Sequence, residues 1–135
     1  MREGDLTGVF QLESAGMRKV IMQLKTSTFD DITHALALYR PGPMDIIPSF
    51  IRRKFNEEKV EYPHKDLEPI LKETYGMIVY QDQIMLIACK FAGYTLGRAD
   101  ILRRAVSKKK KEVLEQERIN FVESSVNRGY SSDTA

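Results

Sequence analysis

The sequence predicts a small, mainly helical domain with at most one short strand or hairpin near residues 75–80. Several segments repeat apolar residues at helical spacing, and each begins after a capping residue or ends at glycine or proline. The run at residues 77–80 is β-branched and aromatic and is too short for a helix. With 135 residues, 42% hydrophobic and 30% charged, the chain can bury one core. We therefore expect a single domain over residues 1–135 with a flexible tail at 131–135.

The first expected helix begins after Ser14, whose hydroxyl can accept a hydrogen bond from a free N–H group of the first turn. Apolar residues then recur at spacings of three and four and form one stripe. The stripe consists of Met17, Val20, Ile21 and Leu24. Because such a stripe is typical of the inward face of a helix, we expect these residues in the core.

A second helix is expected from Phe29 to about Tyr39. Thr28 and Asp31 have the spacing of a capping box, and an acidic first turn suits the helix dipole. The expected buried face consists of Phe29, Ile32, Ala35, Leu36 and Tyr39. Pro41 stops the helix near Arg40, so Tyr39 and Arg40 lie at a rigid turn. Arg40 could face a ligand there or could equally cap the last carbonyls.

Besides a short helix that carries Arg98, Arg103 and Arg104, four further helices follow in the prediction. They cover residues 44–54 with Asp45 as cap, 66–72 with Asp66 as cap, 81–91, and 108–128 ending at Gly129. The last of these has a sparse apolar stripe, made of Val113, Leu114, Phe121, Val122 and Val126. The first ends in a small basic cluster at residues 52–54.

Residues 93–111 form the most basic stretch of the chain. Seven positive side chains lie there against one negative, Asp100, in a chain whose net charge is only +2. Guanidinium groups offer bidentate geometry and ammonium groups add long-range attraction, a combination that suits phosphate. The lysines 108–111 could alternatively be a solvated face. Arg103 and Arg104 lie next to each other between apolar residues. Solubility alone does not require two adjacent arginines there, so the pair favours a binding role.

Composition also excludes several classes of function. A single cysteine, Cys89, cannot form an internal disulfide, and no Cys or His pattern has metal-ligand spacing. His34 and His64 are therefore interpreted as ordinary histidines rather than metal ligands. No run is long enough to span a membrane and no signal core is present at the start, so we expect a cytoplasmic protein.

Six strings occur in an order and at spacings that resemble a known family. They are GVFQLES (8–14), ALYRPGPM (37–44), YPHKDLEPIL (62–71), TYGMIVYQDQIM (74–85), AGYTLGRADILRRAVSKKK (92–110) and FVESSVNRGY (121–130). The chain resembles the fingers region of the bacterial replicative DNA polymerase III alpha subunit, and more closely its Gram-positive versions. The resemblance implies a part in DNA-directed DNA synthesis during chromosomal replication.

In that family three palm aspartates bind two Mg²⁺ ions and run nucleotidyl transfer. The palm motifs are not in this sequence, in which the aspartates are scattered. The resemblance therefore implies an excised piece without catalytic residues or its own metal, inactive in isolation. Implied partners are the incoming deoxynucleoside triphosphate, primer-template DNA, the palm and thumb, and, in the full enzyme, the replisome and sliding clamp.

The resemblance and the charge pattern select the same site residues. Arg103 and Arg104 match the family's Leu-Arg-Arg-Ala string and are expected on the β- and γ-phosphates. Lys108 is expected near the triphosphate. The expected DNA contacts are Lys109, Lys110, Lys111 and Arg98, the last a departure from the commonest family form. Tyr39, Arg40 and Gln81 are expected beside the nascent base pair, although helix capping and core hydrogen bonding are equally good roles for them.

Two rival functions remain open at this stage. A stand-alone helical module could lay its basic helix on duplex phosphates without any nucleotide pocket. A scaffold could instead use the helix at 108–128 to bind a protein partner, although the sparse stripe argues against it. Preference for a nucleoside triphosphate over duplex DNA would separate the fingers function from the first rival.

Overall fold

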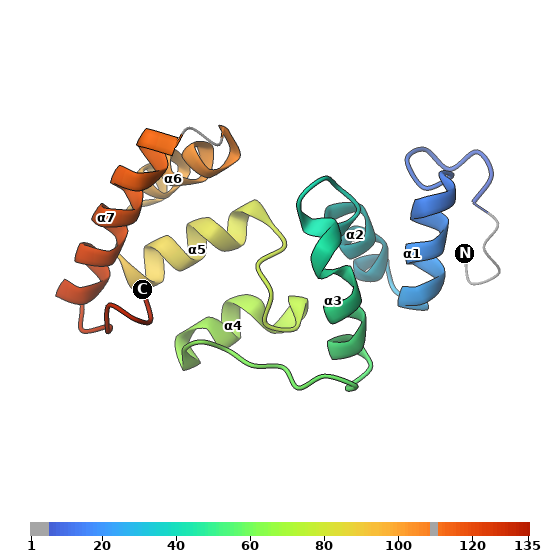
Figure 1. Ribbon diagram of the computed structural model, residues 1–135, viewed down its shortest axis with the longest axis horizontal. Helices are drawn as coiled ribbons and strands as arrows, with labels where there is room; N and C mark the ends of the chain where they lie inside the picture. The colour runs from blue at the N-terminus through green and yellow to red at the C-terminus, as the bar shows by residue number, and fades with distance from the viewer. Residues whose placement is uncertain (1–5, 109–110) are drawn as a thin grey trace. The chain divides into compact units, whose positions relative to one another are not determined.

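The structure, a computed structural model, describes residues 6–108 and 111–135 (Figure 1). Seven α-helices and three short 3-10 helices make up its regular structure, and no β-strand occurs within these two ranges. The prediction of a mainly helical fold is confirmed. The short strand that the sequence allowed near residues 75–80 does not form, because residues 77–80 run as an irregular link into the next helix.

The contacts divide the chain into two compact units, Met1–Val60 and Glu61–Ala135, which are described separately. The sequence had indicated one domain over this whole span. None of the described helices is long and apolar enough to pass through a lipid bilayer.

The first unit is built from three α-helices and one 3-10 helix. They are α1 (Ala15–Leu24), α2 (Phe29–Leu38), η1 (Pro43–Ile46) and α3 (Ile47–Lys54). Ser14 caps α1 as expected, because its side-chain oxygen accepts a hydrogen bond from the Met17 N–H at 3.3 Å. The predicted stripe of α1 is confirmed. Its residues are buried with others from the unit: Leu6, Leu12, Met17, Val20, Ile21, Leu24, Ala35, Leu38, Ile47 and Phe50.

Helix α2 begins with the predicted capping box, formed by Thr28 and Asp31. Its buried face matches the predicted one only in part: Ala35 is buried as expected, and Ile32, Leu36 and Tyr39 are half-buried. Phe29 was expected in the core and is 80% exposed, while Asp31, His34, Ala35 and Leu38 are buried. The residues that are buried have helical spacing, but two of them, Asp31 and His34, are polar. A prediction based on apolar residues alone therefore misplaces part of the buried face of the helix.

Helix α3 ends in the expected basic cluster, but each of its cations has an acidic partner. Arg52 and Arg53 pair with Glu58, and Lys54 pairs with Asp31. The predicted cap at Asp45 is wrong, because α3 is preceded by η1 and Ile46 occupies the N-cap position without a side-chain hydrogen bond. The proline at its start lies in the first turn, where its missing N–H costs nothing.

The second unit is built from four α-helices and two 3-10 helices. They are η2 (Lys65–Leu67), α4 (Glu68–Leu71), η3 (Lys72–Thr74), α5 (Gln81–Phe91), α6 (Leu96–Lys108) and α7 (Lys111–Asn127). Leu67, Leu71 and Phe91 form its core, and Tyr130 stacks on Phe91 at 4.1 Å between ring centroids. The cap of η2 is His64 rather than the predicted Asp66, since its Nδ1 accepts the Asp66 backbone N–H at 3.1 Å.

Helix α7 departs from its predicted apolar stripe. Val113 and Val126 were expected inside and are 42% and 44% exposed, whereas Glu117 and Ser125 are buried. The buried Glu117 is possible because Arg98 of α6 pairs with it, so a charged contact replaces part of the apolar one. After Gly129, which has the left-handed φ of +94° expected at a helix stop, residues 131–135 form a hydrogen-bonded turn.

Candidate functional site

The two adjacent arginines of α6 share one carboxylate. Arg103 donates through Nε to Asp100 Oδ1 at 2.9 Å, and its Nη2 lies 2.7 Å from the same oxygen. Arg104 Nη2 lies 2.6 Å from Asp100 Oδ2. Residues three and four apart lie on one face of a helix, so the spacing of Asp100 brings both guanidinium groups to its two oxygens.

Helix α5 holds Arg103 from the other side. Arg103 Nη1 donates to Gln81 Oε1 at 2.8 Å, and Gln81 Nε2 donates to Ser107 Oγ at 3.1 Å. The Ser107 hydroxyl in turn donates to the Arg103 backbone carbonyl at 2.9 Å. Gln81 is the first residue of α5, so its side chain is free to reach across to α6. The structure thus brings together three residues that the sequence selected for one site: Gln81, Arg103 and Arg104.

The electrostatics of this cluster keep Asp100 ionised. The hydrogen bond from Arg103 lowers the pKa of its carboxyl and outweighs the effect of partial burial, and the charges of Arg104 and Arg103 lower it further. The Asp100 and Arg103 side chains are 26% and 28% exposed, whereas that of Arg104 is 64% exposed. A guanidinium carries five N–H groups, so each arginine keeps donors that Asp100 does not use. Arg104 can therefore offer an open fork to an anion from solvent, and Arg103 can add the hydrogens that remain on its Nη1 and Nη2 atoms.

Helix α6 begins after a turn whose left-handed backbone favours glycine. Gly93 has a φ of +66°, and a Cβ there would lie 2.6 Å from Arg128 Nη1. Thr95 then caps the helix, since its Oγ1 accepts the Arg98 N–H at 3.3 Å. The glycine and the cap together fix where the basic helix starts.

Arg98 faces a different partner from the other two arginines. Its Nη2 lies 2.8 Å and 2.9 Å from the two carboxylate oxygens of Glu117, whose side chain is only 8% exposed. The guanidinium also lies over the ring of Tyr94, 5.3 Å from its centroid. The pair with Glu117 joins α6 to α7. The role of Arg98 in binding DNA stays a prediction, and the structure adds a packing role.

The lysine run lies at the junction of α6 and α7. Lys108 is the last residue of α6 and Lys111 the first of α7, and both are exposed. Lys109 and Lys110, also expected to contact DNA, lie outside the described residues. Lys108 and Lys111 are thus placed where a phosphate backbone could approach from solvent.

Tyr39 and Arg40 belong to the first unit and are described apart from the α6 arginines. Tyr39 is the C-cap residue of α2, and its ring packs on α1 at Gly16, where a Cβ would lie 1.9 Å from the Tyr39 hydroxyl oxygen. Arg40 is exposed, and its carbonyl accepts the Met44 N–H at 3.3 Å in the turn through Gly42, whose φ is +108°. The sequence correctly predicted that α2 ends in a turn there.

Two members of the α6 cluster were not selected from the sequence as site residues. Asp100 was counted only as an opposing charge, although its spacing from both arginines is a signal for ion pairs on a helix. Ser107 gave no such signal, because its partner Gln81 lies 26 residues away in sequence. Only the packing of α5 on α6 reveals that contact.

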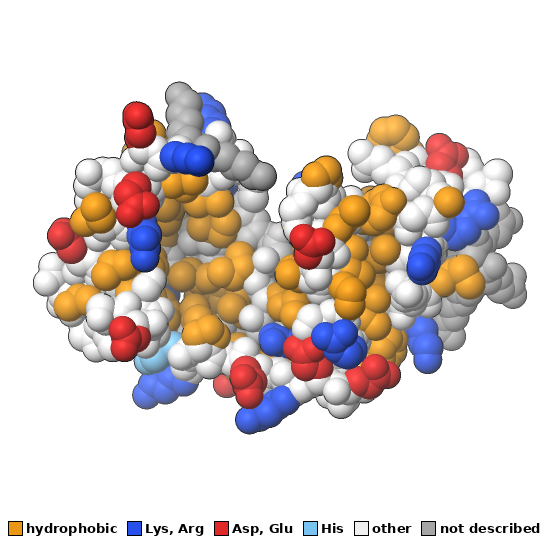
Figure 2. Space-filling model, viewed as in Figure 1, with side chains coloured by type: hydrophobic (Ala, Val, Ile, Leu, Met, Phe, Trp, Pro, Cys, Tyr) orange, Lys and Arg blue, Asp and Glu red, His pale blue; other side chains and the backbone are white. Residues whose placement is uncertain are grey.

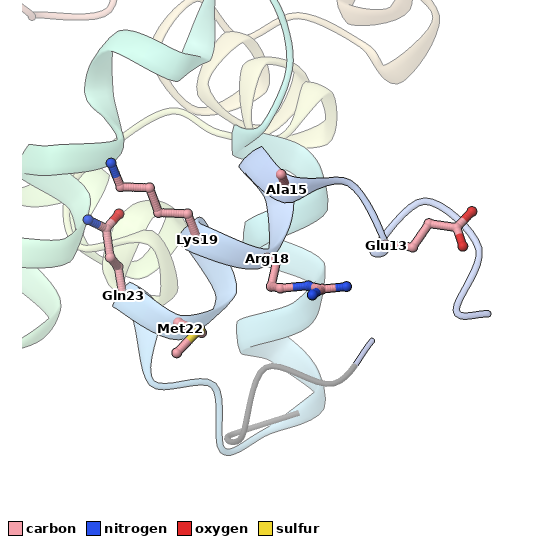
Figure 3. A pocket seen from close by; sticks show the side chains of 6 residues that line it. All are labelled: Glu13, Ala15, Arg18, Lys19, Met22 and Gln23. Carbon is pink, nitrogen blue, oxygen red and sulfur yellow. The ribbon is translucent and has the colours of Figure 1, made fainter. Parts of the chain in front are cut away.

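Two hollows in the described part of the surface do not provide a better candidate. Along the outer side of α1 a hollow of about 560 Å³ is lined by Glu13, Ala15, Arg18, Lys19, Met22 and Gln23. Its charged ends diverge, with Lys19 and Arg18 pointing to opposite sides (Figure 3). In the second unit, α5, α6, α7 and Ile78 line an open hollow of about 240 Å³ with mainly apolar side chains, visible as an orange depression in Figure 2. Neither hollow brings polar groups together as a substrate site requires.

The described residues also offer no fit for the Mg²⁺ ions that the sequence resemblance implies. Within the two described ranges, no three His, Cys, Asp or Glu side chains are grouped so that they could hold a metal ion. Asp100 is occupied by two guanidiniums, and Asp31 by Lys54. No metal-dependent step is assigned to this chain.

Comparison with known proteins gives a consistent result. The family model described as "Bacterial DNA polymerase III alpha subunit finger domain" matches residues 1–129. The chain is 60% identical over 135 residues to the DNA polymerase III subunit alpha of Bacillus subtilis strain 168, and this covers all of the chain and 12% of that protein. It is 57% identical over the same length to the corresponding protein of Halalkalibacterium halodurans, again 12% of that protein. It is 55% identical over 130 residues to that of Staphylococcus epidermidis, 96% of the chain and 12% of the relative.

Proposed function

The chain belongs to the family of bacterial DNA polymerase III alpha subunit finger domains, and we propose that it binds the triphosphate of the incoming nucleotide in such a polymerase. The resemblance found in the sequence is thereby confirmed. The chain spans 12% of the length of these relatives, so the activity and partners of the whole subunit belong to this proposal.

One observation carries the proposal. Two guanidinium groups, Arg103 and Arg104, lie side by side on one face of α6 and are fixed by a common carboxylate. A triphosphate presents several anionic oxygens along a short chain, and two adjacent forks match such an array better than they match a single carboxylate. Gln81, bonded to Arg103 at 2.8 Å, supports a site in which both helices contribute.

The chemistry proposed for this site is electrostatic. Nucleotidyl transfer releases pyrophosphate, and cations placed in advance on its oxygens stabilise the charge that develops in the transition state. Lys108, at the exposed end of α6, adds a further positive charge. We propose that the Mg²⁺ ions of the reaction are held by palm residues outside this chain.

DNA is the second proposed partner. The lysines 108–111 would lie near the template or primer backbone, where each phosphate contact acts mainly through counterion release. Tyr39 and Arg40 are proposed as neighbours of the nascent base pair. The remaining proposed partners are the palm and thumb of the subunit and, through the whole enzyme, the replisome and its sliding clamp.

The test replaces the matching segment of the Bacillus subtilis alpha subunit with this chain and measures single-nucleotide incorporation. Arg103→Ala and Arg104→Ala should each lower kcat/KM for the nucleotide by about 100-fold, as expected for a lost cation on the developing charge. Binding of primer-template DNA should change little. Arg118→Ala is the matched control, because Arg118 is a 74% exposed arginine of α7 that pairs only weakly with Glu115 at 3.6 Å.

Two results would count against the proposal. Normal nucleotide kinetics in both α6 variants would remove the triphosphate role. Weakened duplex binding with unchanged nucleotide kinetics would favour the rival function, a basic helical module for DNA. The chain alone should incorporate no nucleotide, which a primer-extension assay of the pure protein checks.

A further inference from the structure

We propose that Asp100 is a positioning residue, which orients Arg103 and Arg104 so that both face the triphosphate. This inference rests on the proposed function and identifies the group that makes the two arginines act together. Asp100 cannot bind the triphosphate directly, because an ionised carboxylate repels phosphate. Its effect must therefore pass through the cations that it holds.

The two arginines depend on Asp100 to different degrees. Arg103 has a second side-chain partner, Gln81, which is itself bonded to Ser107. Arg104 is bound at 2.6 Å by Asp100, its one polar partner in the described part of the chain. Without Asp100, the long and 64% exposed side chain of Arg104 would be free to sample many rotamers, and repulsion from Arg103 would favour separation of the two charges. Loss of Asp100 should therefore affect Arg104 first.

The geometry favours orientation over blockade. The carboxylate could in principle compete with the ligand for both arginines. However, the Asp100 side chain is 26% exposed and Arg104 is 64% exposed, so an anion arriving from solvent meets the guanidinium of Arg104 before the carboxylate. Arg104 uses one of its nitrogens for Asp100, so donors on the other nitrogens remain for the triphosphate. The triphosphate can thus bind Arg104 without displacing Asp100, and Arg103 adds the hydrogens of Nη1 and Nη2 that Gln81 and Asp100 leave unused.

The test uses the Bacillus subtilis alpha subunit carrying this chain, with Asp100→Asn, Arg104→Ala and the double variant. Asp100→Asn should raise KM for the nucleotide about tenfold, the size of one charge-assisted hydrogen bond, with primer-template affinity unchanged. The double variant should be only slightly worse than Arg104→Ala alone, because Asp100 acts mainly through Arg104, while Arg103 keeps Gln81 as a second partner. Asp100→Glu, which keeps the charge, should recover part of the loss. Glu115→Gln is the matched control: it removes the acidic partner of Arg118, an exposed i, i+3 pair on α7.

A second measurement uses the 135-residue chain itself. Inorganic tripolyphosphate is titrated while the side-chain Nε–H signals of Arg103 and Arg104 are followed by NMR. In the unsubstituted chain both signals should shift, and in Asp100→Asn the shift of Arg104 should be lost while that of Arg103 is largely kept.

The outcomes separate this inference from the proposed function. If Arg103→Ala and Arg104→Ala leave nucleotide kinetics normal, the triphosphate role fails and the inference fails with it. If those variants are impaired but Asp100→Asn has normal or lower KM, or adds its full effect to Arg104→Ala, only the positioning role is overturned. A lower KM would show that Asp100 blocks the site instead.

Discussion

Helices α3 and α6 each carry a pair of adjacent arginines that share one carboxylate, but the carboxylates come from different places. Arg52 and Arg53 of α3 pair with Glu58, which lies in the loop after the helix. In α6 the acid, Asp100, precedes its arginines on the same helix. The cluster around Glu58 thus holds a loop against its helix in the first unit. The cluster around Asp100 orients side chains within one helix of the second unit.

The partners of Glu58 show why its cluster is structural. Its two oxygens accept the Ser49 hydroxyl at 2.5 and 2.6 Å as well as both guanidiniums, so its acceptor capacity is largely filled. The hydrogen bond from Ser49, followed by those from Arg53 and Arg52, lowers the pKa of Glu58 from 4.5 to about 2. The loop backbone returns to the same place, since the Glu57 N–H donates to the Arg52 carbonyl at 2.8 Å. We conclude that the basic residues at the end of α3 stabilise the fold through their acidic partners and do not form a binding site.

The largest expected effect on stability concerns Lys54, the third cation at the end of α3, and its partner Asp31. Asp31 is buried and pairs with Lys54, and the same carboxylate accepts the Ser27 and Thr28 N–H groups just before and at the start of α2. Asp31→Asn leaves the Lys54 ammonium, 13% exposed, without its counter-charge. Unfolding of the first unit should become easier by about 3 kcal/mol, as for other broken buried pairs. Urea titration followed by amide signals of residues 15–54 measures it, with Asp30→Asn as control. An unchanged midpoint would contradict a structural role.

The next effect concerns Arg98, the α6 arginine whose pairing is also structural. Glu117→Gln removes the charge that Arg98 meets at 2.8 Å between α6 and α7. Because the Glu117 side chain is 8% exposed, the change should destabilise the second unit by about 2 kcal/mol, the scale of a hydrogen bond between charged groups. Urea titration read from the α7 amides checks this, with Glu115→Gln as the exposed counterpart. If the two variants unfold alike, Arg98 is free to serve another partner such as DNA.

The contrast between these clusters also marks what the sequence could predict. Local signals succeeded: the Ser14 cap, the Thr28 and Asp31 capping box and the stripe of α1 all follow from spacing within one turn or two. Predictions failed where a distant residue decides the outcome. Glu117 is buried only because Arg98, 19 positions earlier, reaches it, so the α7 stripe could not be found from apolar residues alone.

The candidate site follows the same rule. Arg103 and Arg104 were selected from local charge and from the family string, and the i−3 and i−4 spacing of Asp100 was also visible in the sequence. The link from Gln81 to Ser107 spans 26 positions and depends on how α5 packs on α6. Sequence reasoning therefore finds the charged groups of the site, whereas the structure reveals which groups orient them.

A smaller effect should appear as an acid dependence of the first unit. Burial raises the pKa of Asp31, but hydrogen bonds from Lys54, Ser27 and Thr28 outweigh it and lower the value from 3.8 to about 2. Glu58 is lowered from 4.5 to about 2. Because both values are depressed in the folded state, their stabilisation is complete above about pH 4.5 and is lost as the pH falls toward 2. Urea midpoints of the first unit at pH 6 and pH 3 should show the loss, and Glu58→Gln should reduce it. A pH-independent midpoint would argue that neither carboxylate stabilises the unit.

The smallest effect on stability is expected for Asp100→Asn, and it distinguishes the two arginine pairs most directly. Glu58→Gln should lower the urea midpoint of the first unit, since it loosens a loop that Ser49, Arg52 and Arg53 hold in place. Asp100→Asn should leave the midpoint of the second unit within error, because partly exposed ion pairs three or four apart on a helix contribute little to stability. Circular dichroism and urea titration of both variants measure the difference. If Asp100→Asn lowered stability as much as Glu58→Gln does, Asp100 would be a residue that stabilises the fold. Any loss of nucleotide binding would then reflect a disordered α6. Unchanged stability together with a raised KM leaves orientation of Arg104 as the cause, since the helix that carries the arginine would still be in place.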